Sequence, residues 1–152
     1  MSKYLNFAAM IATSTVVMFG LMYLNTYQAD HVYFSQTRMW MALYMGGAMA
    51  LVMLAFMLKM YDSPVKNWLI VGLAAVAIVL GVTLVRSQAT VGDVAWMKAM
   101  IPHHSIAILT SERANITDPR VRKLADGIIA TQLREIDEMK ALIADLDGRP
   151  AK

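Results

Sequence analysis

The sequence contains no cysteine, and this absence excludes several kinds of site at once. There can be no disulfide, no thiolate metal site and no cysteine nucleophile. Histidine is also scarce, with only three residues in the chain, His31, His103 and His104. Methionine, in contrast, is unusually frequent, with 14 of 152 residues. Any site for a soft metal must therefore use imidazole nitrogen and methionine thioether sulfur.

Charged residues are also scarce: they make up only 16% of the sequence, whereas 58% of the residues are hydrophobic. Together with a mean hydropathy of +0.48, this composition is too apolar for an ordinary soluble domain of this size. The net charge of +3 is spread along the chain, so there is no basic patch and we expect no nucleic-acid partner. Charges are few before Arg86 and frequent after it. We therefore expect a membrane region, 1–86, followed by a region in water.

Three uncharged runs within that region are long enough to cross the lipid bilayer. They cover residues 5–24, 39–58 and 68–85, and a run of about 20 residues at ~1.5 Å each spans a hydrocarbon core of roughly 30 Å. Tyrosine and tryptophan residues fall near the predicted span ends, as expected of rings at the headgroup level. A secretory signal peptide is the alternative for the first run. We favour a membrane anchor, because the apolar run is longer than usual for a signal peptide and no A-x-A-like cleavage site follows it.

The loops between these runs give a predicted topology. The turn at residues 62–64, Asp-Ser-Pro, predicts that the second and third spans are antiparallel neighbours. The basic residues near the span ends divide into Lys3, Lys59 and Lys66 on one side and Arg38 and Arg86 on the other. This slight excess favours a cytoplasmic N-terminus and, with three spans, a C-terminal region outside the cytoplasm.

Methionine recurs at every fourth position along the second predicted span, at Met41, Met45, Met49, Met53 and Met57. One interpretation is a path for a soft metal across the membrane, and the other is flexible apolar packing. No histidine, aspartate or glutamate accompanies the stripe within the span, which favours packing. The small residues Ala42, Gly46 and Ala50 share this spacing and predict a close helix contact, for which an oligomer interface is the natural use.

Beyond a polar linker, 87–92, residues 93–152 are predicted to form a helical hairpin. Asp93 is a suitable N-cap for a helix over 94–114, and Asp118 followed by Pro119 predicts the start of a second helix over 119–146. The second helix has an apolar stripe on one side and charged residues on the other. Two helices of this length cannot enclose a core. We therefore predict an all-α fold in which a homodimer, or a higher homo-oligomer, forms a four-helix bundle.

The first hairpin helix carries the residues with the clearest chemistry. Met97, Met100 and His104 fall within an arc of roughly 60°, and His103 flanks them. Thioether sulfur and imidazole nitrogen suit copper(I), which is soft and accepts few ligands, whereas zinc or iron would require more carboxylate, thiolate or histidine. Pro102 cannot donate a backbone hydrogen bond, so a kink beside the histidine pair is expected.

The second hairpin helix offers Met139 as a further sulfur ligand. It shares a face with Gln132 and Glu135, which are placed to hold imidazole N–H groups. A single methionine on an apolar face is more often a core residue, and Glu135 has an alternative interpretation as a solvated charge. His31 lies in a tyrosine-rich loop, where a histidine is usually solvated or satisfied by a neighbour. The combination of two adjacent histidines with spaced methionines favours a metal site over these alternatives.

The stretch from Met97 to Met139 resembles the bacterial family catalogued as domain of unknown function 305. Its hallmark segment Met-Ile-Pro-His-His stands here at 100–104, followed by Gln132, Glu135-Ile136 and Met139. The resemblance implies a ferritin-like helical bundle associated with copper or silver resistance and facing the periplasm, with Met97, Met100, His103, His104 and Met139 as copper ligands. Thr110 stands where many members carry another methionine. Many members also contain two hairpins, so one hairpin here is consistent with a dimer.

These observations predict a protein of the bacterial inner membrane that binds copper(I), or silver(I), without catalysing a reaction. Its role would be to sequester the metal outside the cytoplasm or to exchange it with a copper-donor or copper-acceptor protein. No Ser/His/Asp set, paired carboxylates or E-x-x-H repeat supports an enzyme, so no catalytic residue or organic cofactor is expected. Two alternatives remain open from the sequence. One is a structural membrane oligomer whose hairpin binds a partner without metal, and the other is a subunit of a metal transporter.

Overall fold

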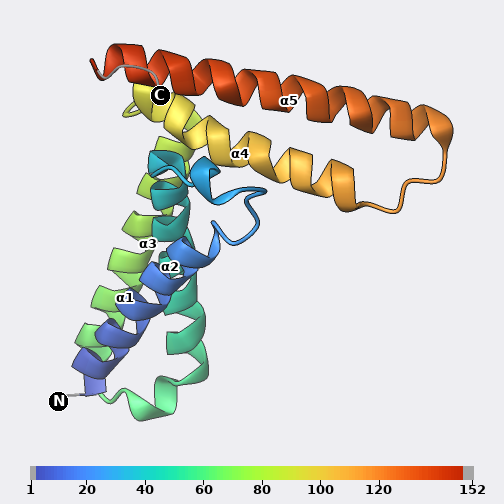
Figure 1. The fold of residues 1–152 in the computed structure, drawn as a ribbon. Helices are drawn as coiled ribbons and strands as arrows, with labels where there is room; N and C mark the ends of the chain where they lie inside the picture. The colour runs from blue at the N-terminus through green and yellow to red at the C-terminus, as the bar shows by residue number, and fades with distance from the viewer. Residues whose placement is uncertain (1–2, 149–152) are drawn as a thin grey trace. The chain divides into compact units, whose positions relative to one another are not determined.

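The computed structural model describes residues 3–148, which are helical throughout apart from turns and connecting segments (Figure 1). The predicted all-α fold is therefore confirmed. The helices in chain order are α1 (Lys3–Leu21), η1 (Ala29–His31), α2 (Gln36–Phe56), η2 (Leu58–Met60), α3 (Pro64–Ser87), α4 (Asp93–Arg113) and α5 (Pro119–Leu146). The chain divides into two compact units. The membrane unit comprises the residues up to Met22 with Thr37–Thr90, and the hairpin unit comprises Tyr23–Gln36 with the residues from Val91 onward.

The helices α1, α2 and α3 are long and apolar enough, by length and composition, to cross a membrane. They correspond to the three predicted spans, with ends that differ by a few residues. The third helix begins earlier than predicted because Pro64 occupies its first turn and the Ser63 side chain accepts a hydrogen bond from the Lys66 N–H. The predicted membrane character of this region is thus supported by helix length as well as by composition.

Contacts at the two ends of the membrane unit define how its helices run. At one end, Tyr4 on α1 accepts a hydrogen bond from the Ser63 N–H and donates one to Asn67, at 3.0 Å in both cases. At the other end, Arg38 on α2 donates to the carbonyl of Met22 at 2.6 Å. The start of α1 therefore lies beside the turn between α2 and α3, and its end lies beside the start of α2. Gly47 on α2 lies against Ala74 on α3, and Gly81 on α3 lies against Trp40 on α2, so these two helices are antiparallel as predicted.

Small residues allow these helices to approach closely. Ala42, Gly46 and Ala50 are all buried, as their spacing predicts. A Cβ atom at Gly46 would collide with the Thr15 side chain of α1. The close contact expected of this stripe is therefore formed at Gly46 with α1 of the same chain.

The hairpin unit is built on α4 and α5, which pack against each other in antiparallel directions (Figure 1). Asp118 caps α5 through a hydrogen bond from the Arg120 N–H at 2.8 Å, and Pro119 follows in the first turn, as predicted. The N-cap of α4 is Gly92 rather than the expected Asp93. The core between the two helices contains Met97, Ile101, Ile108, Ile136, Met139 and Ile143.

Residues Tyr23–Gln36, which we call the covering segment, pack with the hairpin although they lie between α1 and α2 in sequence. Tyr27 and Tyr33 lie against the hairpin core, and Lys140 on α5 forms a 2.6 Å ion pair with Asp30. The domain boundary predicted at residue 86 assigns this segment to the membrane region. In the structure, one side of the two-helix core is instead closed by chain from before α2.

Candidate metal centre

The three predicted sulfur ligands lie in or against the hairpin core. Met97 and Met139 are 5% and 6% exposed and belong to one apolar cluster. Met100 is partly buried and packs against the same cluster. The structure therefore brings together methionines from both helices, as the sequence predicts. Burial of this kind is also what methionine shows in ordinary apolar packing.

His104 is held from both sides of its ring. Its Nδ1 lies 3.0 Å from the carbonyl oxygen of Met100, and its Nε2 lies 2.9 Å from Oε2 of Glu135. A carbonyl oxygen only accepts hydrogen bonds, so Nδ1 carries a proton and donates it to Met100. The other nitrogen, Nε2, faces a carboxylate oxygen, which also accepts, so Nε2–H donates to Glu135 and a metal at Nε2 would replace that hydrogen. Glu135 therefore holds an imidazole nitrogen, as the sequence predicts, and the backbone of Met100 holds the other one.

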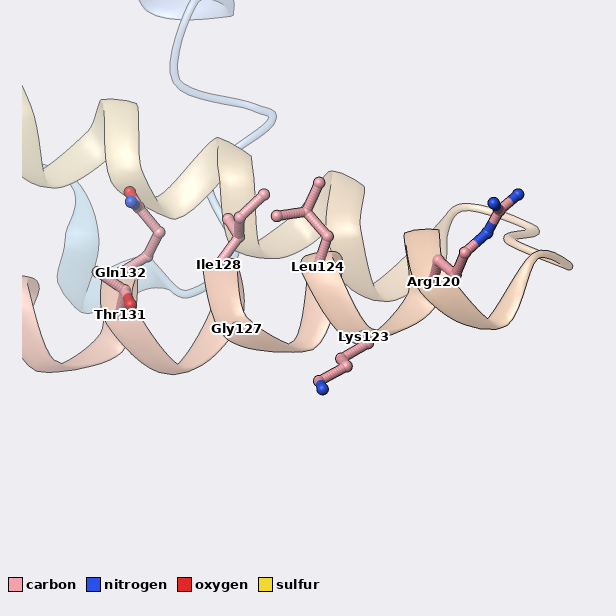
Figure 2. Close-up of a pocket in the computed structure, with 7 residues that line it drawn as sticks. All are labelled: Arg120, Lys123, Leu124, Gly127, Ile128, Thr131 and Gln132. Carbon is pink, nitrogen blue, oxygen red and sulfur yellow. The ribbon is translucent and has the colours of Figure 1, made fainter.

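The other predicted residues lie around this pair. The His103 ring is exposed, with its centroid 6.4 Å from that of His104 and its plane inclined at 71°. Gln132 is partly buried and lines a groove of about 620 Å³ along α5, where Figure 2 shows it on the same side of the helix as Leu124 and Ile128. Within residues 3–148, no three His, Asp or Glu side chains are grouped to hold a metal ion. A metal bound here would therefore need the methionine sulfur atoms.

His31 belongs to the hairpin unit, which the sequence does not indicate. Its side chain is buried, with 3% of the residue exposed, and its Nδ1 lies 3.0 Å from Oγ of Ser105, the residue after His104. The same Oγ accepts a hydrogen bond from the Tyr27 N–H at 2.7 Å. Ser105 itself is fully buried. The partner expected for His31 thus exists, but it lies on α4 rather than in the histidine's own loop. The tyrosines around His31 were the one available signal of burial.

The burial of His31 predicts that the covering segment loosens in acid. Burial is the largest cause that lowers the pKa of His31 below 6.5, and Lys140 lowers it further, while Asp30 and Asp137 oppose this shift. Protonation therefore favours the open or unfolded state. The stabilisation is complete above pH 6.5 and is lost as the pH falls from there towards the folded-state pKa.

We expect amide hydrogen exchange in residues 23–36 to accelerate below about pH 6.5, after correction for the intrinsic rate. A His31→Asn variant should show a flatter dependence, because asparagine does not titrate in this range. Equal pH dependence in the two proteins would show that His31 is not the titrating group.

Comparison with known proteins identifies a family that matches the C-terminal part of the chain. Residues 84–152, which include all of α4 and α5, match a family model described as "Domain of unknown function (DUF305)". The chain is also similar to "Uncharacterized protein L153" of Acanthamoeba polyphaga mimivirus, with 38% identity over 106 residues, or 68% of each chain. No solved structure matches the chain.

Proposed function

We propose that this chain, which belongs to the DUF305 family, binds copper(I) or silver(I) through its hairpin unit and sequesters or hands over the ion outside the cytoplasm. The observation that carries the proposal is the gathering of Met97, Met100 and Met139 in one cluster, with His104 oriented by the backbone of Met100. The two methionines in the core come from different helices. The folded hairpin, rather than one short peptide, therefore presents the sulfur atoms.

The chemistry of these side chains suits a soft monovalent cation. Thioether sulfur is uncharged and polarizable, and it binds copper(I) in preference to hard divalent ions. The hydrogen bond from Nδ1 of His104 to Met100 leaves Nε2 as the nitrogen that can bind metal, in place of its hydrogen bond to Glu135. The Glu135 carboxylate is 2.9 Å from Nε2. When the ion binds, this carboxylate either becomes a further ligand or moves away from the ring. The exposed His103 is the group best placed for first contact with a donor or acceptor protein.

We propose the bacterial inner membrane as the location, with the N-terminus in the cytoplasm. Lys3 forms a 3.1 Å ion pair with Asp62, and Nζ of Lys66 lies 4.9 Å from the centre of the Tyr4 ring. These contacts support the grouping of Lys3 and Lys66 at one end of the membrane unit, on which the orientation by positive charge depends. A reporter fused after Lys152 should then be active only in a form that works outside the cytoplasm. Cytoplasmic activity at that position would reverse the orientation.

A copper(I) titration of the full-length protein in detergent, under anaerobic conditions and against a colorimetric chelator, tests the proposed function. Leucine variants of Met97, Met100 and Met139 remove sulfur while nearly conserving side-chain volume, so folding should be retained. Each of these variants, and His104→Gln, is expected to weaken binding by at least about tenfold, which corresponds to ~1.4 kcal/mol. Met49→Leu in α2 is the matched control and should bind like the unaltered protein.

The alternatives predict different outcomes of these measurements. A structural or partner-binding hairpin predicts no saturable copper(I) uptake, or uptake that the four hairpin variants leave unchanged. Either result would refute our proposal. A transporter subunit predicts copper flux into vesicles that falls in a Met45→Leu/Met49→Leu double variant. Unchanged flux in that variant would leave the methionine stripe of α2 with a packing role only.

A further inference from the structure

An apolar stripe of the hairpin unit remains exposed in the single chain. Leu124, Ile128, Leu142 and Leu146 lie on α5 at spacings that place them on one face of the helix. Leu124 is 64% exposed and Leu146 is 57% exposed. Shallow grooves adjoin both ends of this stripe, one lined by Leu124 and Ile128 and the other by Leu142, Leu146 and Trp96. Two pairs of exposed apolar side chains therefore lie on one face of α5, and a partner helix laid along this face would cover both pairs.

The His104–Glu135 pair lies at the centre of this stripe. Glu135 falls on the same face of α5 and stands midway in sequence between Leu124 and Leu146, and also between Ile128 and Leu142. Its carboxylate meets His104 near the middle of α4. In a two-fold packing of antiparallel helices, a residue at the centre of the contact lies against its own copy. An antiparallel partner centred on this stripe would thus bring two such pairs together.

The charges of α5 favour that direction of packing. Its first part, 119–134, carries four basic residues and one acidic residue: Arg120, Arg122, Lys123 and Arg134, with Asp126. The part from 135 to 147 carries five acidic residues and one basic residue: Glu135, Asp137, Glu138, Asp145 and Asp147, with Lys140. Two copies in parallel would oppose like charges, whereas antiparallel copies place the basic part of each helix beside the acidic part of the other.

We propose that a second copy of this chain docks antiparallel on the exposed stripe of α5, and that the two copies share one copper(I) site. Met100 and His104 of each copy then face the two-fold axis, so each chain alone holds half of the imidazole ligands. The docked copy also shields the pair from water, which strengthens its interactions with a cation. The nature of the ion rests on the function proposed above, whereas the docking rests on the stripe and the charges.

Disulfide cross-linking tests the direction of docking, because the chain has no cysteine of its own. Two differently tagged full-length chains, one with Ile128→Cys and one with Leu142→Cys, are co-expressed and oxidised in copper-free nanodiscs. We expect a mixed disulfide between them. Chains that both carry Ile128→Cys should not cross-link, because antiparallel docking separates these positions by roughly 21 Å. Cross-linking of Ile128→Cys with itself, or of neither pair, would overturn the proposal.

Charge reversal tests the basis of the docking with the same readout. Arg120→Glu with Lys123→Glu should lower the yield of the mixed disulfide several-fold, because acidic residues then face the acidic part of the partner. Adding Glu138→Lys and Asp145→Lys to the same chain should restore the yield. A yield that is insensitive to both changes would show that charge does not set the direction of docking.

The number of copper(I) ions bound per chain distinguishes a site shared by two chains from a site within each chain. A shared site predicts one copper(I) for every two chains, and it predicts that the Arg120→Glu/Lys123→Glu chain loses affinity in parallel with cross-linking. Tight uptake of one copper(I) per chain, unaffected by these substitutions, would overturn the shared site and leave copper binding intact. Cross-linking without any copper uptake would refute the proposed function and retain the docked pair.

Discussion

Replacement of Ser105 by valine is expected to release the covering segment from α4 and to destabilise the hairpin unit by about 2–6 kcal/mol. The Oγ of Ser105 accepts a hydrogen bond from Tyr27 and is bonded to His31, and both serine and histidine are buried. Valine leaves the Tyr27 N–H and Nδ1 of His31 without this partner, beside a position that is fully buried. Each unsatisfied buried group costs roughly 1–3 kcal/mol.

The measurement is hydrogen exchange of residues 23–36 in the full-length protein, together with its thermal unfolding in detergent. Ser105→Ala removes the same hydroxyl without adding volume, so it should show the same loss of protection. Thr110→Val is the matched control, because Thr110 is exposed and its hydroxyl bonds the backbone of its own helix. If the Ser105 variants protect residues 23–36 as well as the control does, the serine does not hold the covering segment.

Replacement of Gly47 by alanine is expected to destabilise the membrane unit by about 1–3 kcal/mol. A Cβ atom at this position would lie 2.8 Å from the backbone carbonyl oxygen of Ala74 and 3.0 Å from a side-chain carbon of Ile78. A carbonyl on a helix cannot rotate away as the end of a flexible side chain can. The helices α2 and α3 must therefore separate, and they lose contacts along their length.

Gly72→Ala provides the comparison, because nothing lies within 4 Å of a Cβ atom at that position on α3. This substitution should be neutral or slightly stabilising, since alanine favours helix more than glycine does. Unfolding of both variants by a denaturing detergent, followed by circular dichroism, gives the difference. Similar midpoints for Gly47→Ala and Gly72→Ala would show that the approach of α2 to α3 is looser than the structure indicates.

Much of the hairpin could be predicted because its signals are local. Pro119 with the cap Asp118 gives the start of α5, and the helical period places Met97, Met100 and His104 within one arc of α4. The structure divides that arc between two environments. Met97 enters the core, whereas the ring of His104 turns to Glu135. Spacing along one helix gives the angle of each side chain but not the neighbour that each angle meets.

The covering segment could not be predicted for a different reason. The contact between Tyr27 and Ser105 joins residues 78 positions apart, and no periodicity in a short loop indicates such a partner. The same applies to His31, whose role depends on the cavity that α4 and α5 leave for it. The residues next to a histidine in the sequence do not distinguish a solvated loop histidine from a buried one.

The sequence by itself determined that three helices are apolar enough to cross a membrane and that a capped helical hairpin follows them, because hydrophobic runs, helical period and caps act over a few residues. Only the tertiary structure decided that residues 23–36 close the hairpin core, that Gly46 faces α1 while Gly47 faces α3, and that the Met100 carbonyl holds the second ring nitrogen of His104. These features depend on which surfaces meet after the helices have formed. Such meetings are settled by the packing of shapes and buried polar groups that lie far apart along the chain.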